Sequence, residues 1–191
     1  MHHRFTTPLS EADVRNLRLQ DTVSLDGAMF GIRDATQIRI FDEGIAPPED
    51  LNGGACLHTA PGVRKRPDGT YEKLSIGTTT SARMDRFAPG LLEKYGVRAI
   101  IGKGGLLEGT VAAMQKFGGV YLAIVGGAAA LATDQIESIE RVWWEDLMPE
   151  CFWQFRVKNF GPLIVAIDAH GNSLYKNIQQ RAAERIARIE L

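Results

Sequence analysis

Residues 88–127, with the sequence APGLLEKYGVRAIIGKGGLLEGTVAAMQKFGGVYLAIVGG, limit the possible folds more than any other part of the chain. Helix-length segments alternate here with short apolar runs, and glycines separate them. The pattern predicts two helices, closed by Gly96 and Gly118. Each helix precedes a buried strand, over 98–102 and from residue 120 onward. Helices that alternate with apolar strands indicate an α/β fold.

The segments before and after this region predict further short elements. Ser10 is the expected N-cap of a short helix. Residues 22–34 alternate loosely between apolar and polar side chains, as a half-buried strand does, and 35–44 predict a helix closed by glycine. Residues 63–74 predict an exposed polar excursion with a turn. Several strands are expected from residue 135 onward. The chain then closes with an amphipathic helix over 179–191, whose apolar residues include Ala183, Ile186, Ala187 and Ile189.

Composition bounds the class of protein. A chain of 191 residues can build one domain with its own core, so we expect a single domain over 1–191. The net charge of -1 and the absence of any long Lys or Arg run argue against nucleic acid or a membrane surface as a partner. The apolar stretch 121–132 is shorter than the roughly 20 residues that a spanning helix needs. No secretory signal is visible, so we expect a soluble, cytoplasmic protein.

The two cysteines, Cys56 and Cys151, lie far apart in the sequence and neither belongs to a C-x-x-C pair. No zinc or cluster site can therefore be assigned to this chain. Free cysteine packs as a small hydrophobic residue, so both are expected to be buried thiols.

The stretch GTTTSARMD, residues 77–85, predicts a glycine turn followed by a helix start. Free backbone N–H groups at a helix N-terminus attract anions, and hydroxyls add donors. Thr79 and Arg83 are four residues apart, so on a helix they share a face and could converge on one ligand. The alternative is that Thr78 or Thr79 caps the helix while Arg83 pairs with Asp85.

Two further cations stand at predicted strand ends. Lys103 follows the apolar strand in AIIGKGG, and Arg33 follows the strand before GIRDA. A phosphate-binding loop of the G-x-x-x-x-G-K-[ST] form is excluded because Gly104 follows Lys103. Together with Arg83, these residues exceed what one carboxylate needs, because a buried dianion requires several charged donors. We infer a dicarboxylate or a similarly charged metabolite as ligand.

The motifs GIRDA, GTTTSARMD, VRAIIGKGG and IDAHGNSLY, in this order, resemble the C-terminal domain or β subunit of class I iron-sulfur-dependent fumarases and L-tartrate dehydratases. The resemblance covers nearly the whole chain, from TTPLSEADVRNL to GNSLY. It implies a hydro-lyase, most simply a fumarate hydratase that adds water to fumarate to give malate. An L-tartrate dehydratase β subunit and a separate dicarboxylate-binding module are the alternatives.

The resemblance also implies a cofactor and a partner. Family enzymes use a [4Fe-4S] cluster with one open iron as a Lewis acid, and the cluster cysteines lie on the other subunit or domain. Such a cluster needs three thiolates, and this chain has two cysteines. The implied partner is a cluster-bearing α subunit in an α2β2 assembly, without which this chain would be inactive.

Matching positions imply the site residues. Arg33, Arg83 and Lys103 would bind carboxylates and stabilise the charge that develops when a carbon proton leaves. Thr79 would bind substrate and take part in proton transfer, with Lys103 as its catalytic partner. A threonine hydroxyl is a poor base without an activating group, and Lys103 or a residue of the other subunit is the candidate.

Several positions depart from the family pattern. Thr78 replaces a proline, Gln37 replaces a histidine, and HTAPG replaces an aromatic-x-G-P form, which leaves the substrate open. The implied fold is a swivelling β/β/α domain, similar to phosphohistidine domains. His58 and His170 are nevertheless expected to be structural.

The aromatic stretch at 142–155 has two explanations. Core strands account for part of it, and a contact with the cluster-bearing subunit is the alternative because interfaces are enriched in Trp and Phe.

Overall fold

The computed structural model describes residues 1–125 and 127–188, without the side chains of 128–130. The strands are β1 (His2–Thr6), β2 (Thr22–Ile32), β3 (Ala55–His58), β4 (Gly62–Lys65), β5 (Tyr71–Ser75), β6 (Ala99–Gly102), β7 (Val120–Ala123), β8 (Ile136–Trp143) and β9 (Phe152–Ile167). The α-helices are α1 (Glu11–Arg15), α2 (Asp34–Phe41), α3 (Ala88–Tyr95), α4 (Glu108–Phe117) and α5 (Leu174–Ile186). Short 3₁₀ helices are η1 (Ser81–Phe87), η2 (Ala128–Gln135) and η3 (Glu145–Leu147).

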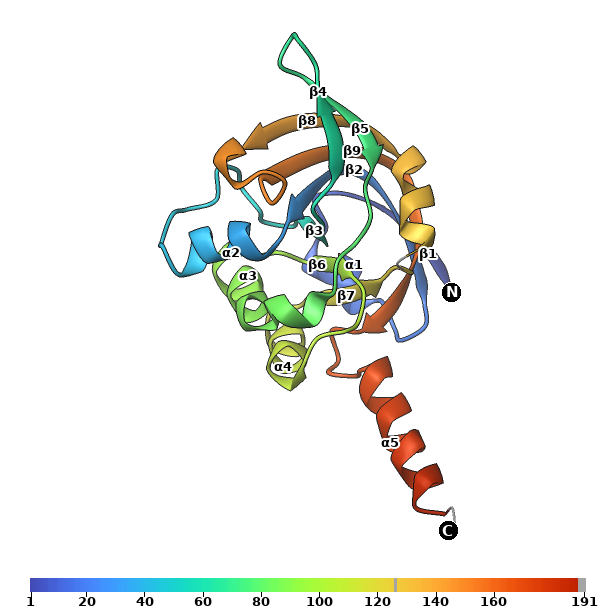
Figure 1. The fold of residues 1–191 in the computed structure, drawn as a ribbon. Coiled ribbons are helices and arrows are strands. Elements are labelled where there is room, and N and C mark those ends of the chain that lie inside the picture. Colours follow the sequence, from blue (N-terminus) through green and yellow to red (C-terminus); the bar gives the residue numbers. More distant parts are fainter. Residues whose placement is uncertain (126, 189–191) are drawn as a thin grey trace.

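The main sheet closes on itself as a barrel (Figure 1). Its strand order is β1-β2-β3-β6-β7-β9-β8, and an additional pairing joins β2 to β9. Strands β2, β3, β6 and β7 run parallel, whereas β9 is antiparallel to both β2 and β7. The closure depends on the 16 residues of β9, which are enough to pair with three neighbours. Closure pairs β9 with both β2 and β7 and leaves β1 and β8 at the two ends of the strand order.

Side chains from the strands fill two cores, one on each side of the barrel wall. In β6, Ala99 and Ile101 lie in the cluster inside the barrel, and Ile100 lies in the cluster beneath the helices. Successive side chains of a strand point to opposite faces, so a strand buried on both faces is apolar throughout. The buried strand predicted over 98–102 is therefore confirmed.

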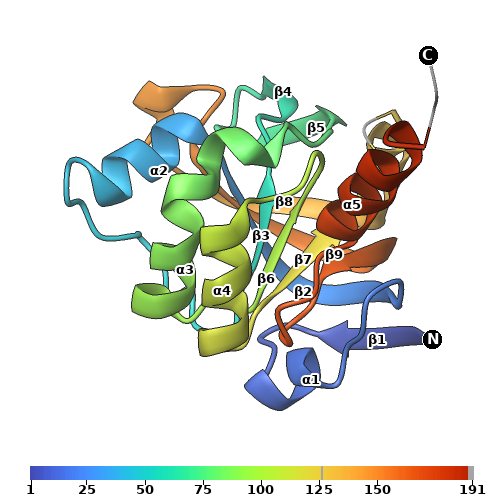
Figure 2. The same cartoon turned by 90° about the horizontal axis from the view of Figure 1, so that it is seen from below.

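Helices α2, α3 and α4 lie along one side of the barrel (Figure 2). The ends of α3 and α4 follow the sequence signals, because Gly96 and Gly118 adopt positive φ angles of 64° and 72° there. Helix α2 instead ends at Phe41, before Gly44, which the sequence predicted to close it. The N-cap predicted at Ser10 is confirmed, and Asp13 completes a capping box with it.

Helix α5 projects away from the barrel and carries the chain toward its C-terminus (Figure 1). It begins at Leu174, earlier than the predicted residue 179, because Ser173 accepts a hydrogen bond from the Lys176 amide and caps it. No residue of this helix, within its bounds, is buried, and Ile186 is 69% exposed. The predicted apolar residue Ile189 lies outside the described residues.

The exposed excursion predicted over 63–74 lies in the β4–β5 hairpin, with Gly69 in the turn at a φ of 84°. Phe152, Trp153 and Phe155 are fully buried in the chain's own cores, which confirms the core explanation for that part of the stretch. The likeness to phosphohistidine domains stays a prediction. Within the described residues, no helix is both long and apolar enough to cross a membrane.

Candidate active site

Segment 77–81 occupies the space that opens where strands β3 and β6 end. Just beyond the last paired residues of these strands, Thr78 pairs with Thr59 and Thr80 pairs with Lys103. The predicted strand end and helix start are present on either side of the segment, at the end of β5 and the start of η1. Between them, single bridges to Thr59 and Lys103 fix the backbone of this inserted segment.

The hydroxyls of this segment do not cap a helix. The hydroxyl of Thr78 donates to the backbone oxygen of His58 at 3.0 Å. The Ser81 hydroxyl lies 2.9 Å from His58 Nδ1 and accepts from the Tyr121 hydroxyl at 3.0 Å. Thr80 is the N-cap of η1, without a side-chain hydrogen bond. The interpretation of these residues as helix caps was therefore wrong, because backbone and side-chain groups of β3 compete for them.

The alternative ion pair between Arg83 and Asp85 was also wrong. Asp85 Oδ1 instead accepts from the Leu107 amide at 2.7 Å and from the Thr110 hydroxyl at 2.8 Å. This carboxylate thus joins η1 to the start of α4. Arg83 is left available for other partners.

Gly102 is required by the inserted segment. A Cβ atom built at Gly102 would lie 2.0 Å from the Ser81 hydroxyl oxygen, which is far inside van der Waals contact. The glycine in AIIGKGG therefore makes room for Ser81 and its bond to His58.

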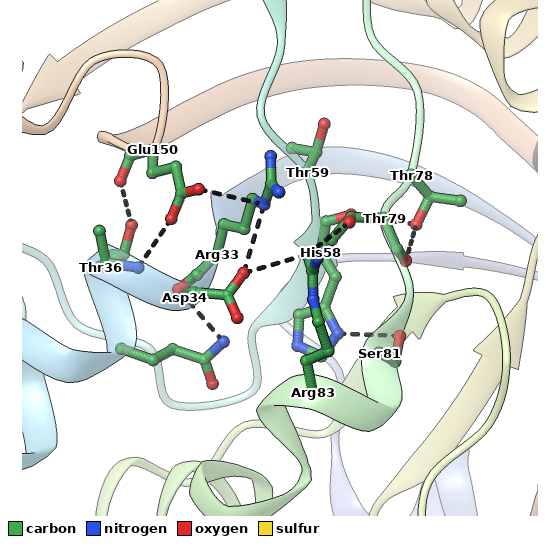
Figure 3. A network of polar contacts seen from close by, with 12 residues as sticks. Arg33, Asp34, Thr36, His58, Thr59, Thr78, Thr79, Ser81, Arg83 and Glu150 are labelled. Carbon is green, nitrogen blue, oxygen red and sulfur yellow. Dashed lines mark hydrogen bonds and ion pairs between the residues drawn. The ribbon is translucent and has the colours of Figure 1, made fainter.

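Thr79, Arg83 and Asp34 converge on the same side of the barrel end (Figure 3). Arg83 Nη2 donates to the Thr79 hydroxyl at 2.9 Å and to Asp34 Oδ2 at 3.2 Å. The predicted convergence of Thr79 and Arg83 is thus present, although Thr79 lies outside the helix that begins at Ser81. The Arg83 side chain remains 50% exposed, which leaves it accessible to a ligand.

Arg33 is held at the start of α2 by two carboxylates. Its Nε atom lies 3.3 Å from Asp34 Oδ2 and 3.3 Å from Glu150 Oε1. Within the described part of the chain, Nη1 and Nη2 of Arg33 have no hydrogen-bond partner. Asp34 therefore links Arg33 to Arg83, and each guanidinium keeps nitrogen atoms that could bind a ligand carboxylate.

Lys103 is joined to this group through its backbone. Its carbonyl oxygen accepts from the Ser81 amide at 2.8 Å. Among the described residues, its ammonium group forms no ion pair within 4.0 Å. Arg33, Thr79 and Arg83 are thus connected by side-chain contacts, whereas Lys103 is connected to them only by the inserted segment.

Sequence reasoning missed Asp34 and Glu150. Asp34 directly follows Arg33 in the sequence, and a carboxylate next to a candidate site arginine was a usable signal. Glu150 gave no local signal, because 115 residues separate it from Ala35, whose amide it accepts.

His58 and His170 have structural surroundings, as expected. His58 is fully buried, and burial lowers its pKa to about 4, so the ring is neutral at physiological pH. His170 Nε2 lies 2.9 Å from the carbonyl oxygen of Arg15. Gln37, which replaces the family histidine, is buried and donates to the carbonyl oxygen of Arg33 at 3.4 Å.

The two thiols do not suit an iron-sulfur cluster. Burial raises the pKa of Cys56 to about 12 and that of Cys151 to about 11, whereas cluster ligands are thiolates. Among the described residues, no three His, Cys, Asp or Glu side chains are grouped so that they could hold a metal ion. This chain's own residues therefore do not fit a cluster.

A cavity of about 730 Å³ opens between α4 and α5, beside Gly104 and Gly105. Its lining includes Leu107, Tyr175 and Lys176. The cavity adjoins Lys103 through the glycines but does not contain Arg33, Thr79 or Arg83.

The site places two arginine side chains and a threonine hydroxyl together at the end of an α/β barrel. The chain belongs to the family described as "Fumarase C-terminus", whose model matches residues 3–178. The resemblance inferred from the motifs is therefore confirmed, and the family is one of hydro-lyases.

Individual relatives cover nearly all of this chain. It is 42% identical over 181 residues to "L(+)-tartrate dehydratase subunit beta" of Escherichia coli (strain K12), covering 94% of this chain and 90% of the relative. It is 36% identical over 183 residues to "Putative L(+)-tartrate dehydratase subunit beta" of Methanocaldococcus jannaschii, covering 93% of each. It is 36% identical over 187 residues to "Putative fumarate hydratase class I" of Geobacillus stearothermophilus, covering 96% of this chain but 35% of that relative.

Proposed function

We propose that this chain is the β subunit of a hydro-lyase that acts on a small hydroxy-dicarboxylate. The observation that carries the proposal is the link from Arg33 through Asp34 to Arg83 and Thr79, with contacts of 2.9–3.3 Å. Two guanidinium groups provide charge-assisted donors for two carboxylates. The hydroxyl of Thr79 accepts a hydrogen bond from one of these guanidinium groups, that of Arg83.

The chemistry assigned to these residues is the removal of a proton from carbon. Loss of that proton places negative charge on the adjacent carboxylate, and Arg33 and Arg83 would stabilise it. Because Arg83 donates to Thr79 Oγ1, it stabilises negative charge on that oxygen and lowers the cost of losing the hydroxyl proton. Arg83 thus joins Lys103 as a candidate for the group that activates Thr79.

A partner α subunit completes this proposal. The thiols of this chain are buried and protonated, so the proposed [4Fe-4S] cluster belongs to the partner. When bound there, the cluster would supply a Lewis acid for the departing hydroxyl. Support comes from the relatives named as beta subunits and from the Geobacillus relative, most of whose length has no counterpart here.

The substrate is proposed to be L-tartrate ahead of malate or fumarate. The sequence alone favoured fumarate, and that preference stays a prediction. The higher identity to the tartrate dehydratase subunit and the matching lengths of the two chains favour tartrate.

Reconstitution tests the proposal. The chain is mixed anaerobically with a candidate cysteine-bearing α subunit, and dehydration of L-tartrate and hydration of fumarate are followed. Activity is expected only in the mixture. Full activity of this chain alone would refute the two-subunit proposal. Calorimetry on the isolated chain tests the alternative of a separate binding module, which tight binding of malate or tartrate without a partner would favour.

A further inference from the structure

Glu150 uses both carboxylate oxygens and its backbone at the start of helix α2. Its Oε1 forms an ion pair with Arg33 Nε at 3.3 Å, and its Oε2 accepts from the Ala35 amide at 2.8 Å. Its backbone oxygen accepts from the Thr36 hydroxyl. Three contacts of different kinds therefore fix the loop that precedes β9 against the element that carries Arg33 (Figure 3).

The contact with Arg33 involves the side of the guanidinium that a ligand does not need. A guanidinium is planar, and its Nη1 and Nη2 atoms form the fork that matches a carboxylate. Because Nε is held by Glu150 and Asp34, the plane of the group is set while the fork stays available. The side chains of Arg33 and Glu150 are 26% and 22% exposed, so water screens the pair only in part.

Glu150 is better placed than Asp34 for this purpose. Asp34 Oδ2 is shared between Arg33 and Arg83, so it cannot orient either one alone. Among the described residues, Arg33 is the one cation that pairs with Glu150, whose other carboxylate oxygen accepts from a backbone amide of α2.

We propose that Glu150 is a positioning residue that orients the Arg33 guanidinium for a substrate carboxylate. The proposal deepens the proposed function and rests on it for its catalytic consequence. The change in KM that it predicts has the opposite sign to the change that a simple charge effect predicts. A carboxylate that merely reduced the positive field at Arg33 would weaken substrate binding, and its removal would lower KM.

The Glu150→Gln variant separates these effects. The amide oxygen of Gln can still accept from the Ala35 amide, whereas the negative charge beside Arg33 Nε is lost. In the reconstituted enzyme we expect KM to rise about tenfold and kcat to fall as well, because Arg33 is proposed both to bind the substrate carboxylate and to stabilise the charge that develops on it. An unchanged or lowered KM would overturn the proposal.

Glu145→Gln is the matched control. Glu145 lies in the same connection, but its carboxylate contacts Lys65 and accepts from Tyr71 at 2.7 Å. Its kinetic constants should equal those of the wild type. Glu150→Gln should also have no further effect when Arg33 is already Ala, because it acts through Arg33. An equal tenfold loss in that background would refute the assignment.

A second measurement does not depend on activity. In the isolated full chain, the NMR signal of the Arg33 Nε–H, assigned by its loss in Arg33→Lys, should be protected from solvent exchange. The Nε–H also donates to Asp34 Oδ2, so Glu150→Gln should speed its exchange without abolishing the hydrogen bond, and an unchanged exchange rate would overturn the anchoring step. An inactive wild-type mixture, together with a protected signal, would instead refute only the proposed function.

Discussion

Arg83 donates a hydrogen bond from Nη2 to the hydroxyl oxygen of Thr79 at 2.9 Å, and the same nitrogen contacts Asp34 at 3.2 Å. The Arg83 guanidinium therefore fixes the Thr79 hydroxyl, and the Asp34 carboxylate in turn fixes the guanidinium. A hydroxyl oxygen that accepts from a cation carries negative charge more easily than one in water. In the proposed reaction, this pair would connect carboxylate binding to proton transfer.

Replacement of Arg83 by Ala should lower kcat/KM of the reconstituted enzyme by about 10² or more, the scale for losing one electrostatic donor. Arg86→Ala is the matched control, because Arg86 lies on the same 3₁₀ helix and pairs with Asp42 at the surface. Steady-state kinetics with the preferred dicarboxylate measures both. Equal losses in the two variants would show that the effect comes from the helix and not from the site.

Replacement of Thr79 by Val should lower kcat by about 10² while KM changes little, because general acid–base groups act mainly on the transition state. Val keeps the shape of the side chain and removes the hydroxyl. Thr80→Val is the control, since the Thr80 side chain is exposed and does not bond the N-terminus of η1. A Thr79→Val enzyme with wild-type kcat would exclude the hydroxyl from proton transfer.

Gly102→Ala should destabilise the protein by about 2–3 kcal/mol, the upper part of the range for forcing extra volume into a packed site. The new Cβ would lie 2.0 Å from Ser81 Oγ, and Ser81 is held by His58 and Tyr121. Unfolding in urea measures the free energy. The double variant with Ser81→Ala should recover part of the loss, because the two changes share one clash.

Gly109→Ala provides the opposite control. Gly109 lies within α4, and a Cβ there meets no atom within 4 Å. Alanine should stabilise the protein by about 0.5–1 kcal/mol, because it favours the helix over the unfolded chain. Similar losses at both glycines would contradict the steric explanation.

The sequence could predict what depends on neighbours along the chain. The helix ends at Gly96 and Gly118 and the apolar strand between them follow from local conformational preference and periodicity. The pairing of Thr79 with Arg83 was also accessible, because four residues separate them. The barrel closure between β2 and β9 was not, since it joins strands that are distant in sequence.

The same distinction explains the errors at the site. Thr78 has the composition of a helix cap, but its hydroxyl donates to His58, which belongs to another strand. A local preference was overridden by a tertiary contact of comparable strength. Glu150 approaches Arg33 only because the chain folds back after β8, and no spacing in the sequence indicates that approach.

The buried ring of His58 should make stability depend on pH in a narrow range. Burial holds its native pKa at about 4, below the value of about 6.5 for an exposed histidine, so the unfolded chain binds a proton first as pH falls. The stability contribution is thus complete above about pH 6.5 and is lost between about pH 6.5 and 4. Asp26, whose pKa is held at about 2 mainly by a hydrogen bond from Arg4, loses its contribution only at lower pH.

Urea unfolding of the isolated chain at pH 7.5 and pH 4.5 measures this effect. The wild type should lose on the order of 2–3 kcal/mol more than His58→Gln does over that range, because one proton-binding difference is removed. The comparison uses the change with pH, so a destabilised His58→Gln chain remains informative. If both chains lost the same free energy, the pH dependence would have to come from other groups, and His58 would be protonated as readily in the folded as in the unfolded state.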